Sequence, residues 1–398
     1  MTDPTDDPVL SVEDLHVQFD TYGGPVRAVD GVSFDLHPGE TVCLVGESGA
    51  GKTVTCETIT GLIPAPPGEV TDGSITFEGA ELTDAAERQL REIRGDRIAY
   101  VFQHPQNALD PVYTIGDQLV ETIGYHRDVA DEAARNEAVE LLDRVGIAKP
   151  ANRLGDYPHE LSGGMRQRVA IAMALAGDPD VLVADEPTAD LDVTIEAQIL
   201  DLLRELQAER DLAVVYVTHD LGIVAGIADT VVVMYAGTVM ERASVDRLFD
   251  RPAHPYTRAL LESLPGRGEM VPIPGQHPDP TDYPDGCPFD PRCPHAVPEC
   301  SEGGRPAFHE TLGGSDVACV FYRDDRDSTV VAPDREEGTR AVSARDPDSS
   351  DPVGSGPPTD ESASRDGADR GSRDGADRDS RDGADRDSRD GAGRGDGA

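Results

Sequence analysis

Residues 46–53, GESGAGKT, match the phosphate-binding pattern G-x-x-x-x-G-K-[ST]. Glycines let backbone N–H groups turn toward a phosphate with no Cβ in the way. In this pattern the amine of Lys52 reaches the β- and γ-phosphates, and the hydroxyl of Thr53 binds Mg²⁺. The alternative is a Gly-rich turn before an ordinary helix, but Lys52 is one of only two lysines in the chain. We predict that this phosphate loop binds nucleotide through Gly46, Glu47, Ser48, Gly49, Ala50, Gly51, Lys52 and Thr53.

Two adjacent acids follow the apolar segment 181–184. Asp185 suits the coordination sphere of Mg²⁺, and Glu186 can orient and deprotonate an attacking water molecule. Neighbouring side chains on a strand point to opposite faces, so the two carboxylates can hold different roles. A solvated acidic turn is the alternative in so acidic a chain. The apolar strand before the pair and the phosphate loop elsewhere favour the catalytic interpretation.

A third motif, LSGGMRQR at residues 161–168, lies between these two and opens an apolar helix. Ser162, Gly163 and Gly164 can form a phosphate-sized nest of backbone N–H groups at the start of that helix.

The elements that must position these motifs alternate short apolar strands with helical patterns over residues 9–265, which indicates an α/β domain. Residues 114–145 carry helical periodicity and no strong strand, so we predict a helical insertion at about 104–165. Buried strands are predicted at 41–45, 181–184 and 213–218.

Beyond this domain the composition changes twice. Residues 266–323 are rich in Pro, Cys and turn formers, and they have too few apolar residues to fold alone. We therefore expect this Cys-rich extension to dock on the α/β domain. From residue 324 to 398 apolar residues thin out and the unit SRDGADR recurs at a period of eight, which predicts a disordered acidic tail.

The charge of the chain excludes whole classes of partner. Asp and Glu number 77 against 35 Lys and Arg, a formal net charge of −42. Nucleic acid and anionic lipid are therefore not expected partners, because both require clustered cations. The composition resembles that of proteins from salt-accumulating halophiles. No segment approaches the roughly 18 apolar residues of a membrane span, and no signal peptide is recognisable, so we expect a cytoplasmic protein.

The motifs together resemble the ATPase domain of ABC transporters. LSGGMRQR is similar to the family's signature motif, and Gln103, in VFQHPQNALDP, is similar to its Q-loop glutamine. His219 resembles the switch histidine, and Leu191 with Asp192 resembles the D-loop, although Asp190 departs from the more usual alanine. The resemblance implies a P-loop ABC ATPase domain over residues 9–265, with an antiparallel β subdomain and the helical insertion.

The resemblance also implies roles for residues across a dimer of two ATPase domains that close around two ATP molecules. Ser162 and Gly164 would act on the partner's γ-phosphate. Gln103 would sense Mg²⁺ and the attacking water, and His219 would hold the γ-phosphate and position Glu186. An aromatic ring would stack on adenine: Phe19 is our choice and Tyr22 the alternative, with a core aromatic as the other interpretation of Phe19.

Three segments resemble the oligopeptide/dipeptide importer group: QHPQNALDPVYTIGDQL, RPAHPYTRALLESLP and GCPFDPRCPHAVPEC. That group implies a second, related ABC ATPase chain, two membrane permease subunits and an extracellular solute-binding protein, with this chain peripheral at the cytoplasmic face of the membrane. Nickel or sugar importers are the first alternative. A soluble ABC ATPase acting on DNA or ribosomes is the second, and the single P-loop, the lack of long heptads and the negative charge oppose it.

The extension carries four cysteines with the spacing C-x5-C-x6-C-x18-C. Four thiolates suffice for zinc or for a [4Fe–4S] cluster, and zinc sites usually use C-x2–4-C. We favour iron–sulfur, which some members of the resembled family are thought to carry, while zinc, disulfides and bare thiols stay open. Cys43 and Cys56 are expected to be packed thiols. The candidate ligands are Cys287, Cys293, Cys300 and Cys319.

Overall fold

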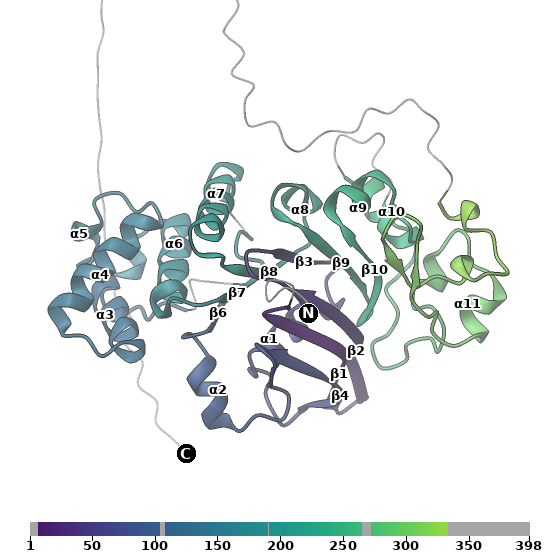
Figure 1. Cartoon of the computed structure of the whole chain (residues 1–398), viewed down its shortest axis with the longest axis horizontal. Coiled ribbons are helices and arrows are strands. Elements are labelled where there is room, and N and C mark those ends of the chain that lie inside the picture. The colour runs from purple at the N-terminus through teal and green to yellow at the C-terminus, as the bar shows by residue number, and fades with distance from the viewer. Residues whose placement is uncertain (1–6, 104–107, 190, 265–271, 333–398) are drawn as a thin grey trace, which may run out of the picture. The chain divides into compact units, whose positions relative to one another are not determined.

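The computed structural model describes residues 7–103, 108–189, 191–264 and 272–332 (Figure 1). A four-stranded antiparallel sheet has the order β2-β1-β4-β5. Its long strands pair antiparallel, for example Val17 with Val29 and Val70, and the register shifts at several points along β1. Alternate side chains of these strands pack inward, as expected for a sheet with one buried face. The strands are β1 (Leu10–Thr21), β2 (Gly24–Leu36), β4 (Gly68–Phe77) and β5 (Ala80–Glu81).

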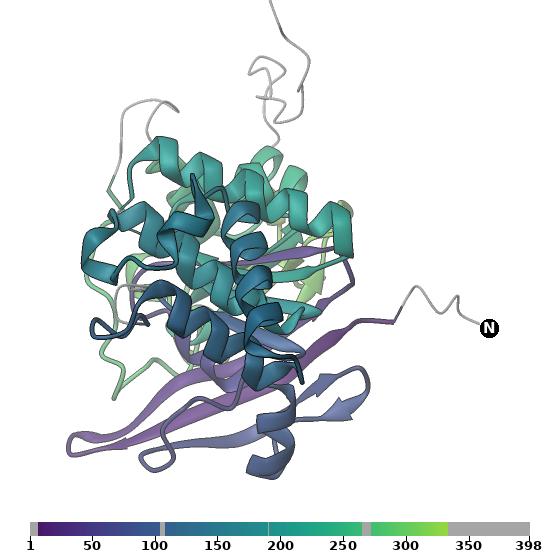
Figure 2. The ribbon, with the colours of Figure 1, turned by 90° about the vertical axis from the view of Figure 1, so that its left-hand side faces the viewer.

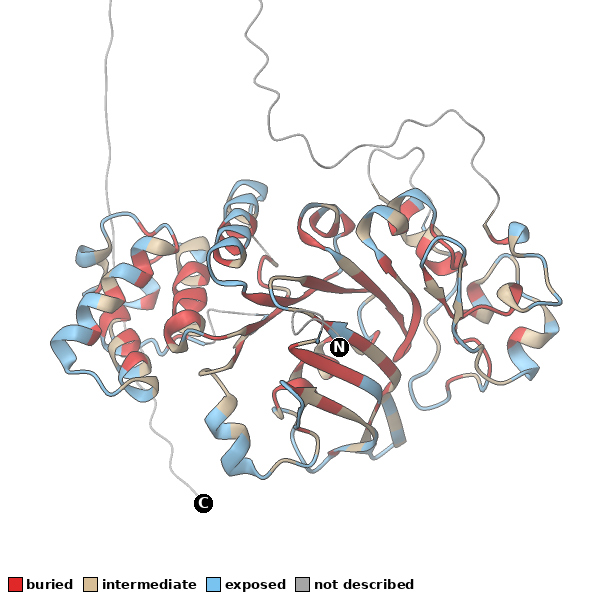
Figure 3. Cartoon of the chain, viewed as in Figure 1, coloured by how far each residue is buried: buried red, intermediate tan, exposed pale blue. Residues whose placement is uncertain are grey.

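The second sheet has eight strands in the order β11-β12-β10-β9-β3-β8-β7-β6. Strands β3, β8, β7 and β6 run parallel, and every residue of β3, β7 and β8 is buried (Figure 3). Burial on both faces explains their continuous apolar sequences. The strands predicted at 41–45, 181–184 and 213–218 are confirmed. The bounds are β3 (Thr41–Val45), β6 (Ile98–Val101), β7 (Val181–Asp185), β8 (Ala213–Thr218), β9 (Thr230–Tyr235) and β10 (Thr238–Ser244).

Helices follow the strands and form a separate group between β6 and β7 (Figures 1 and 2). In that group α3 packs on α4 and α6 through buried residues at helical spacing, including Ile115, Leu119 and Ile123. This group lies where the helical insertion was predicted. The helices are α1 (Lys52–Ile59), α2 (Glu87–Ile93), α3 (Ile115–His126), α4 (Asp131–Arg144), α5 (Pro150–Arg153), η2 (Pro158–Glu160), α6 (Gly163–Ala174), η3 (Leu175–Gly177), α7 (Val193–Arg210), α8 (Leu221–Ile227) and α9 (Val245–Asp250).

The Cys-rich extension continues the large sheet. Strand β12 pairs antiparallel with β10, with Val317 opposite Glu241, and apolar side chains such as Phe289 and Phe321 join the main core. The predicted docking of the extension on the α/β domain is thus confirmed. Its elements, with the preceding helix, are α10 (Pro255–Glu262), η4 (Asp290–Arg292), α11 (Pro298–Glu302), β11 (His309–Glu310), β12 (Asp316–Val317), η5 (Val320–Tyr322) and η6 (Ser328–Val330).

The boundary predicted for the acidic tail, residue 324, is too early. Residues 328–330 form a 3-10 turn, and Val331 is fully buried against the main core. One buried valine in a polar stretch is enough to anchor it, and a thinning of apolar residues alone does not reveal that. The predicted tail from 333 onward lies outside the described residues. Among the described residues, none of the helices combines the length and the apolar content needed to cross a membrane.

Salt should stabilise this fold. Residues 333–398 hold 18 acidic and 11 basic residues, a net −7, so residues 1–332 carry −35 of the total −42. Salt screens this self-repulsion, and most of the screening is complete near 0.5 M because the Debye length is then only about 4 Å. We expect Tm to rise by about 5 °C or more between 0.05 and 0.5 M KCl and more slowly above.

The same rise should appear in a chain truncated after Ala332, since most of the charge remains. A Tm that does not change below 0.5 M KCl, in a calorimetric scan of either chain, would contradict the explanation.

Candidate functional site

The phosphate loop connects β3 to α1 and is packed against backbone on two sides. Gly46 has a φ of 155°, and a Cβ there would lie 2.1 Å from the carbonyl oxygen of Met234. Gly51, which precedes α1, has a φ of 98°, and its Cβ would lie 2.5 Å from the carbonyl oxygen of Ala28. No side chain fits at either position. These glycines therefore fix the course of the loop that leads its N–H groups to the start of α1.

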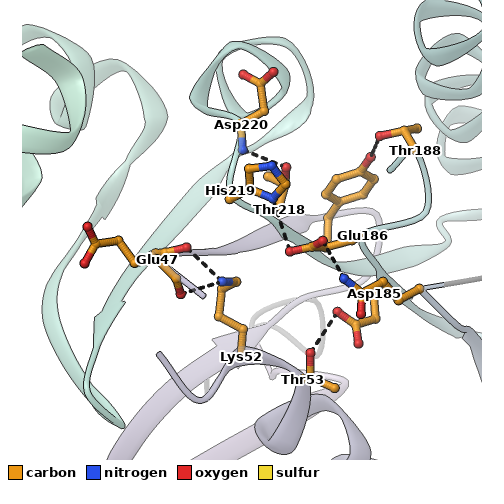
Figure 4. Close-up of polar contacts among 12 residues, drawn as sticks. Glu47, Lys52, Thr53, Asp185, Glu186, Thr188, Thr218, His219 and Asp220 are labelled. Atoms are coloured by element: carbon orange, nitrogen blue, oxygen red, sulfur yellow. Dashed lines mark hydrogen bonds and ion pairs between the residues drawn. The ribbon is translucent and has the colours of Figure 1, made fainter. Parts of the chain in front are cut away.

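Lys52 lies in the middle of the site and is 6% exposed. Its Nζ donates to the carbonyl oxygens of Gly46 at 2.8 Å and Glu47 at 3.0 Å (Figure 4). Burial lowers the pKa of Lys52, and the nearby charges of Glu186 and Asp185 oppose that shift. An ammonium group surrounded by carbonyls and carboxylates is an effective phosphate ligand, because it can exchange carbonyl contacts for phosphate oxygens.

Thr53 and Asp185 bring hard oxygen atoms together. The Thr53 hydroxyl donates to Asp185 Oδ1 at 3.3 Å, and the Tyr100 hydroxyl donates to Asp185 Oδ2 at 3.2 Å. Burial raises the pKa of Asp185, whereas the two hydroxyl groups lower it. Burial destabilises the charged form of this carboxylate, and a bound cation would stabilise it. Carboxylate and hydroxyl oxygens are also the ligands that Mg²⁺ prefers. Thr53 at the start of α1 and Asp185 at the end of β7, two of the residues predicted for Mg²⁺, therefore meet here.

Glu186 is held through both carboxylate oxygens. Its Oε2 accepts a hydrogen bond from the Gln103 amide at 2.8 Å, and its Oε1 lies 3.2 Å from Nδ1 of His219 (Figure 4). Its backbone φ is 44°, a left-handed conformation that is costly for a residue with a side chain. Glu186 is largely buried, while His219 is mostly exposed. The structure thus joins the three predicted residues Gln103, Glu186 and His219 around one carboxylate.

The signature segment lies on another element. Ser162 caps α6 by accepting a hydrogen bond from the Met165 N–H at 3.3 Å, and Ser162 and Gly163 are exposed. Gly164 is required by packing, because a Cβ there would lie 2.7 Å from Ile195 of α7. Among the hydrogen bonds and ion pairs of the described residues, none joins residues 162–164 to the phosphate loop.

The two candidates for adenine stacking differ sharply. Phe19 is partly buried in the core of the antiparallel sheet, and its ring lies close against Gly68. Tyr22 is fully exposed in the turn after β1. The packing of Phe19 agrees with the alternative interpretation, a core aromatic, and its adenine contact stays a prediction. In the D-loop, Asp192 caps α7, whereas Asp190 lies outside the described residues.

Three polar residues of the site were missed from the sequence. Tyr100 holds Asp185, Tyr256 accepts a hydrogen bond from the Glu47 N–H at 3.0 Å, and Arg292 forms an ion pair with Glu47. Tyr256 lies in the HPYT segment, which resembles a family hallmark, and that was the only signal for it. No pattern in the sequence relates Arg292 to the phosphate loop.

The four cysteines of the extension line one small cavity of about 10 Å³, together with apolar side chains such as Val320 and Phe321. All six cysteines are free, so the disulfide alternative is wrong for this structure. Burial raises the pKa of Cys287 to about 12 and those of Cys293 and Cys319 to about 11. Among the described residues, no three His, Cys, Asp or Glu side chains converge on a single metal ion.

Comparison with known proteins shows the same architecture. The family model described as "ABC transporter" matches residues 29–189, and "Oligopeptide/dipeptide transporter, C-terminal region" matches residues 240–300. The chain is 51% identical over 296 residues to the dipeptide transport ATP-binding protein DppD of Bacillus subtilis (strain 168), covering 73% of this chain and 88% of that protein. The chain belongs to the ABC transporter ATP-binding proteins.

Other matches agree with this assignment. The oligopeptide transport ATP-binding protein OppD of Bacillus subtilis (strain 168) is 48% identical over 75% of this chain and 85% of its own length. Among solved structures, a dimer of the ATP-binding cassette MJ0796 in a post-hydrolysis state with ADP and Pi has a TM-score of 0.54 and 27% identity, covering 59% of this chain and 98% of that one. The protein is therefore an ABC ATPase, an enzyme that hydrolyses ATP with Mg²⁺.

Glu186→Gln should reduce kcat of this ABC ATPase by about 100-fold or more, because an amide cannot accept the proton of the attacking water. ATP affinity should stay within about threefold, since the phosphate loop is unchanged. The measurement is phosphate release together with binding of a fluorescent ATP analogue.

Glu196→Gln is the matched control. Glu196 is a partly buried acid on α7 that lies outside the group formed by Gln103, Glu186 and His219. Its kcat should stay within about twofold of the unmodified protein. Unchanged turnover in Glu186→Gln would remove Glu186 from the catalytic role.

Proposed function

We propose that Glu186 is the general base for ATP hydrolysis. The observation that carries this proposal is the fixation of both Glu186 oxygens by Gln103 and His219, in the same site as the buried Lys52. Each oxygen keeps a lone pair with which the carboxylate can accept a proton. A strained backbone at the end of a buried strand supports the same assignment, because strain of this kind is retained where a side chain must be aimed.

The chemistry needs one proton transfer and one bond exchange. As water attacks the γ-phosphorus, Glu186 takes its proton. The bond from the γ-phosphorus to the bridging oxygen of the β-phosphate breaks, and ADP leaves with that electron pair. Lys52 neutralises charge on the β- and γ-phosphates, and His219, exposed beside Glu186, holds the γ-phosphate.

Thr53, Asp185 and Gln103 are the residues proposed to hold Mg²⁺ and its water ligands, which fits the converging oxygens of the first two. Bound Mg²⁺ supplies positive charge against the phosphate oxygens. Ser162, Gly163 and Gly164 reach the ATP of a second ABC ATPase chain. The exposure of Ser162 and Gly163 supports this role, as does the lack, within the described part of the chain, of a hydrogen bond from the segment to its own phosphate loop.

The transported solute is proposed to be a dipeptide or oligopeptide. Relatives named for dipeptide and oligopeptide transport are 51% and 48% identical, and residues 240–300 match the C-terminal region of such transporters. In this proposal the chain pairs with a second, related ATPase and sits on two membrane permease subunits at the cytoplasmic face. An extracellular solute-binding protein delivers the peptide.

Uptake tests the solute directly. Cells of the source organism that lack this chain should lose most uptake of radiolabelled dipeptides or oligopeptides. A plasmid copy should restore it, and a Glu186→Gln copy should not, because transport depends on hydrolysis. Normal peptide uptake together with lost nickel or sugar uptake would show that the cargo is different. The tagged chain, purified from membranes, should bring with it a second ATPase and two permeases.

The cysteine cavity is proposed to hold a [4Fe–4S] cluster. All four thiols line one mostly apolar cavity, and four thiols are the donor set of such a cluster, while in the described part of the chain no three donors converge as a single zinc ion would need. Because burial raises the pKa values of these thiols, ligation of a cluster would have to displace their protons. The chain's own part is to supply the four thiols and to exclude water around them.

Protein purified without oxygen should contain about four iron and four sulfide per chain. Cys287→Ser should lose most of both, whereas Cys56→Ala should keep them, because Cys56 lies in α1, outside the extension. One zinc per chain, or no metal, would contradict the cluster while leaving the ATPase proposal intact.

A further inference from the structure

The phosphate loop receives a contact from a residue about 240 positions away. Arg292 of the extension forms two parallel hydrogen bonds to Glu47, with Nη1 to Oε2 at 2.6 Å and Nη2 to Oε1 at 3.0 Å. Such a pair is strong and directional. The Arg292 side chain is only 5% exposed, so solvent does little to weaken the interaction.

The remaining donors of Arg292 bind two carbonyls of the extension and one hydroxyl of strand β9. Nε donates to the Pro274 carbonyl at 2.9 Å, Nη1 to the Tyr235 hydroxyl at 3.1 Å and Nη2 to the Ile273 carbonyl at 3.4 Å. Gly275 makes room, because a Cβ there would lie 2.9 Å from Arg292 Cγ. The guanidinium therefore has one fixed position, and that position is aimed at Glu47.

Glu47 is anchored at three points. Its side chain binds Arg292, its N–H donates to the Tyr256 hydroxyl, and its carbonyl accepts from Lys52. The Lys52 contact competes with phosphate, but the other two do not. Figure 4 shows the Glu47 side chain directed away from Lys52. Its carboxylate thus ties the phosphate loop to the extension.

We propose that Arg292 is a positioning residue for ATP binding, which holds the phosphate loop through Glu47 in the conformation that receives the phosphates. Without this contact the loop would have to become ordered when ATP binds. The free energy of ordering would then be subtracted from the binding free energy, and the affinity for ATP would fall. The groups around the attacking water follow other strands, β6, β7 and β8, so turnover of bound ATP should change little.

The test measures ATP affinity, KM and kcat of the full chain with Arg292→Gln. We expect Kd and KM to rise about five- to tenfold while kcat stays within about twofold. Arg292→Lys should recover only part of the affinity, because an ammonium group cannot make two parallel bonds. Glu47→Gln should raise Kd by a similar factor. The double variant should have a Kd no higher than that of the single variant that binds ATP more weakly, because both substitutions remove the same contact.

Arg305→Gln is the matched control. Arg305 also ties the extension to the α/β domain, through an ion pair with Asp30, but does not touch the phosphate loop. Its Kd should stay within about twofold. An equal loss of affinity in this variant, or an unchanged Kd in Arg292→Gln with an intact thermal transition, would overturn the proposal. If Arg292→Gln fails to fold, the same comparison is made with Glu47→Gln. A raised Kd in Glu47→Gln with an unchanged Kd in the control would support the proposal, and an unchanged Kd in Glu47→Gln would overturn it.

Discussion

The edge at which the parallel strands end is the constraint on which the site depends. The phosphate loop follows β3, Asp185 and Glu186 stand at the end of β7, His219 follows β8, and Gln103 follows β6. Because these four strands are neighbours in one parallel sheet, groups far apart in sequence meet within hydrogen-bond distance. The strands are buried on both faces, so packing fixes their positions. The polar groups at the strand ends are therefore held in fixed positions as well.

The sequence predicts the structure correctly where neighbouring residues along the chain determine it. The strands at 41–45, 181–184 and 213–218 are continuous apolar runs, and the phosphate loop is specified by its own glycines. It is less informative where the structure depends on packing between residues that are distant in the sequence. Strand β6 has only four residues and was not distinguished, the packing of Phe19 depends on β4, and Val331 is buried by residues from elsewhere. The cysteine spacing indicated a site but gave no distance between thiols.

The extension packs as part of the ATPase domain and not as a separate unit. Its strand β12 extends the large sheet, its aromatic side chains complete the core, and residues 287–293 carry both two cavity thiols and Arg292. Tyr235, Tyr256 and Phe289 pack ring to ring, with Tyr256 bound to the Glu47 N–H and Phe289 beside His254, which lines the cavity. A close-packed aromatic group transmits displacement because it has few voids in which to absorb it. A chain of packed side chains thus connects the cysteine cavity to the phosphate loop.

The pairing of Arg292 with Glu47 also sets an order of events while the chain is being made. Glu47 emerges from the ribosome 245 residues before Arg292, the difference between 292 and 47. At about 5–20 residues per second this interval lasts about 12–50 s. During that time the nascent phosphate loop has its glycines, Lys52 and the helix behind it but lacks its distant anchor. If Arg292 positions the phosphate loop as proposed, the loop reaches its full affinity for nucleotide only after Arg292 has been made.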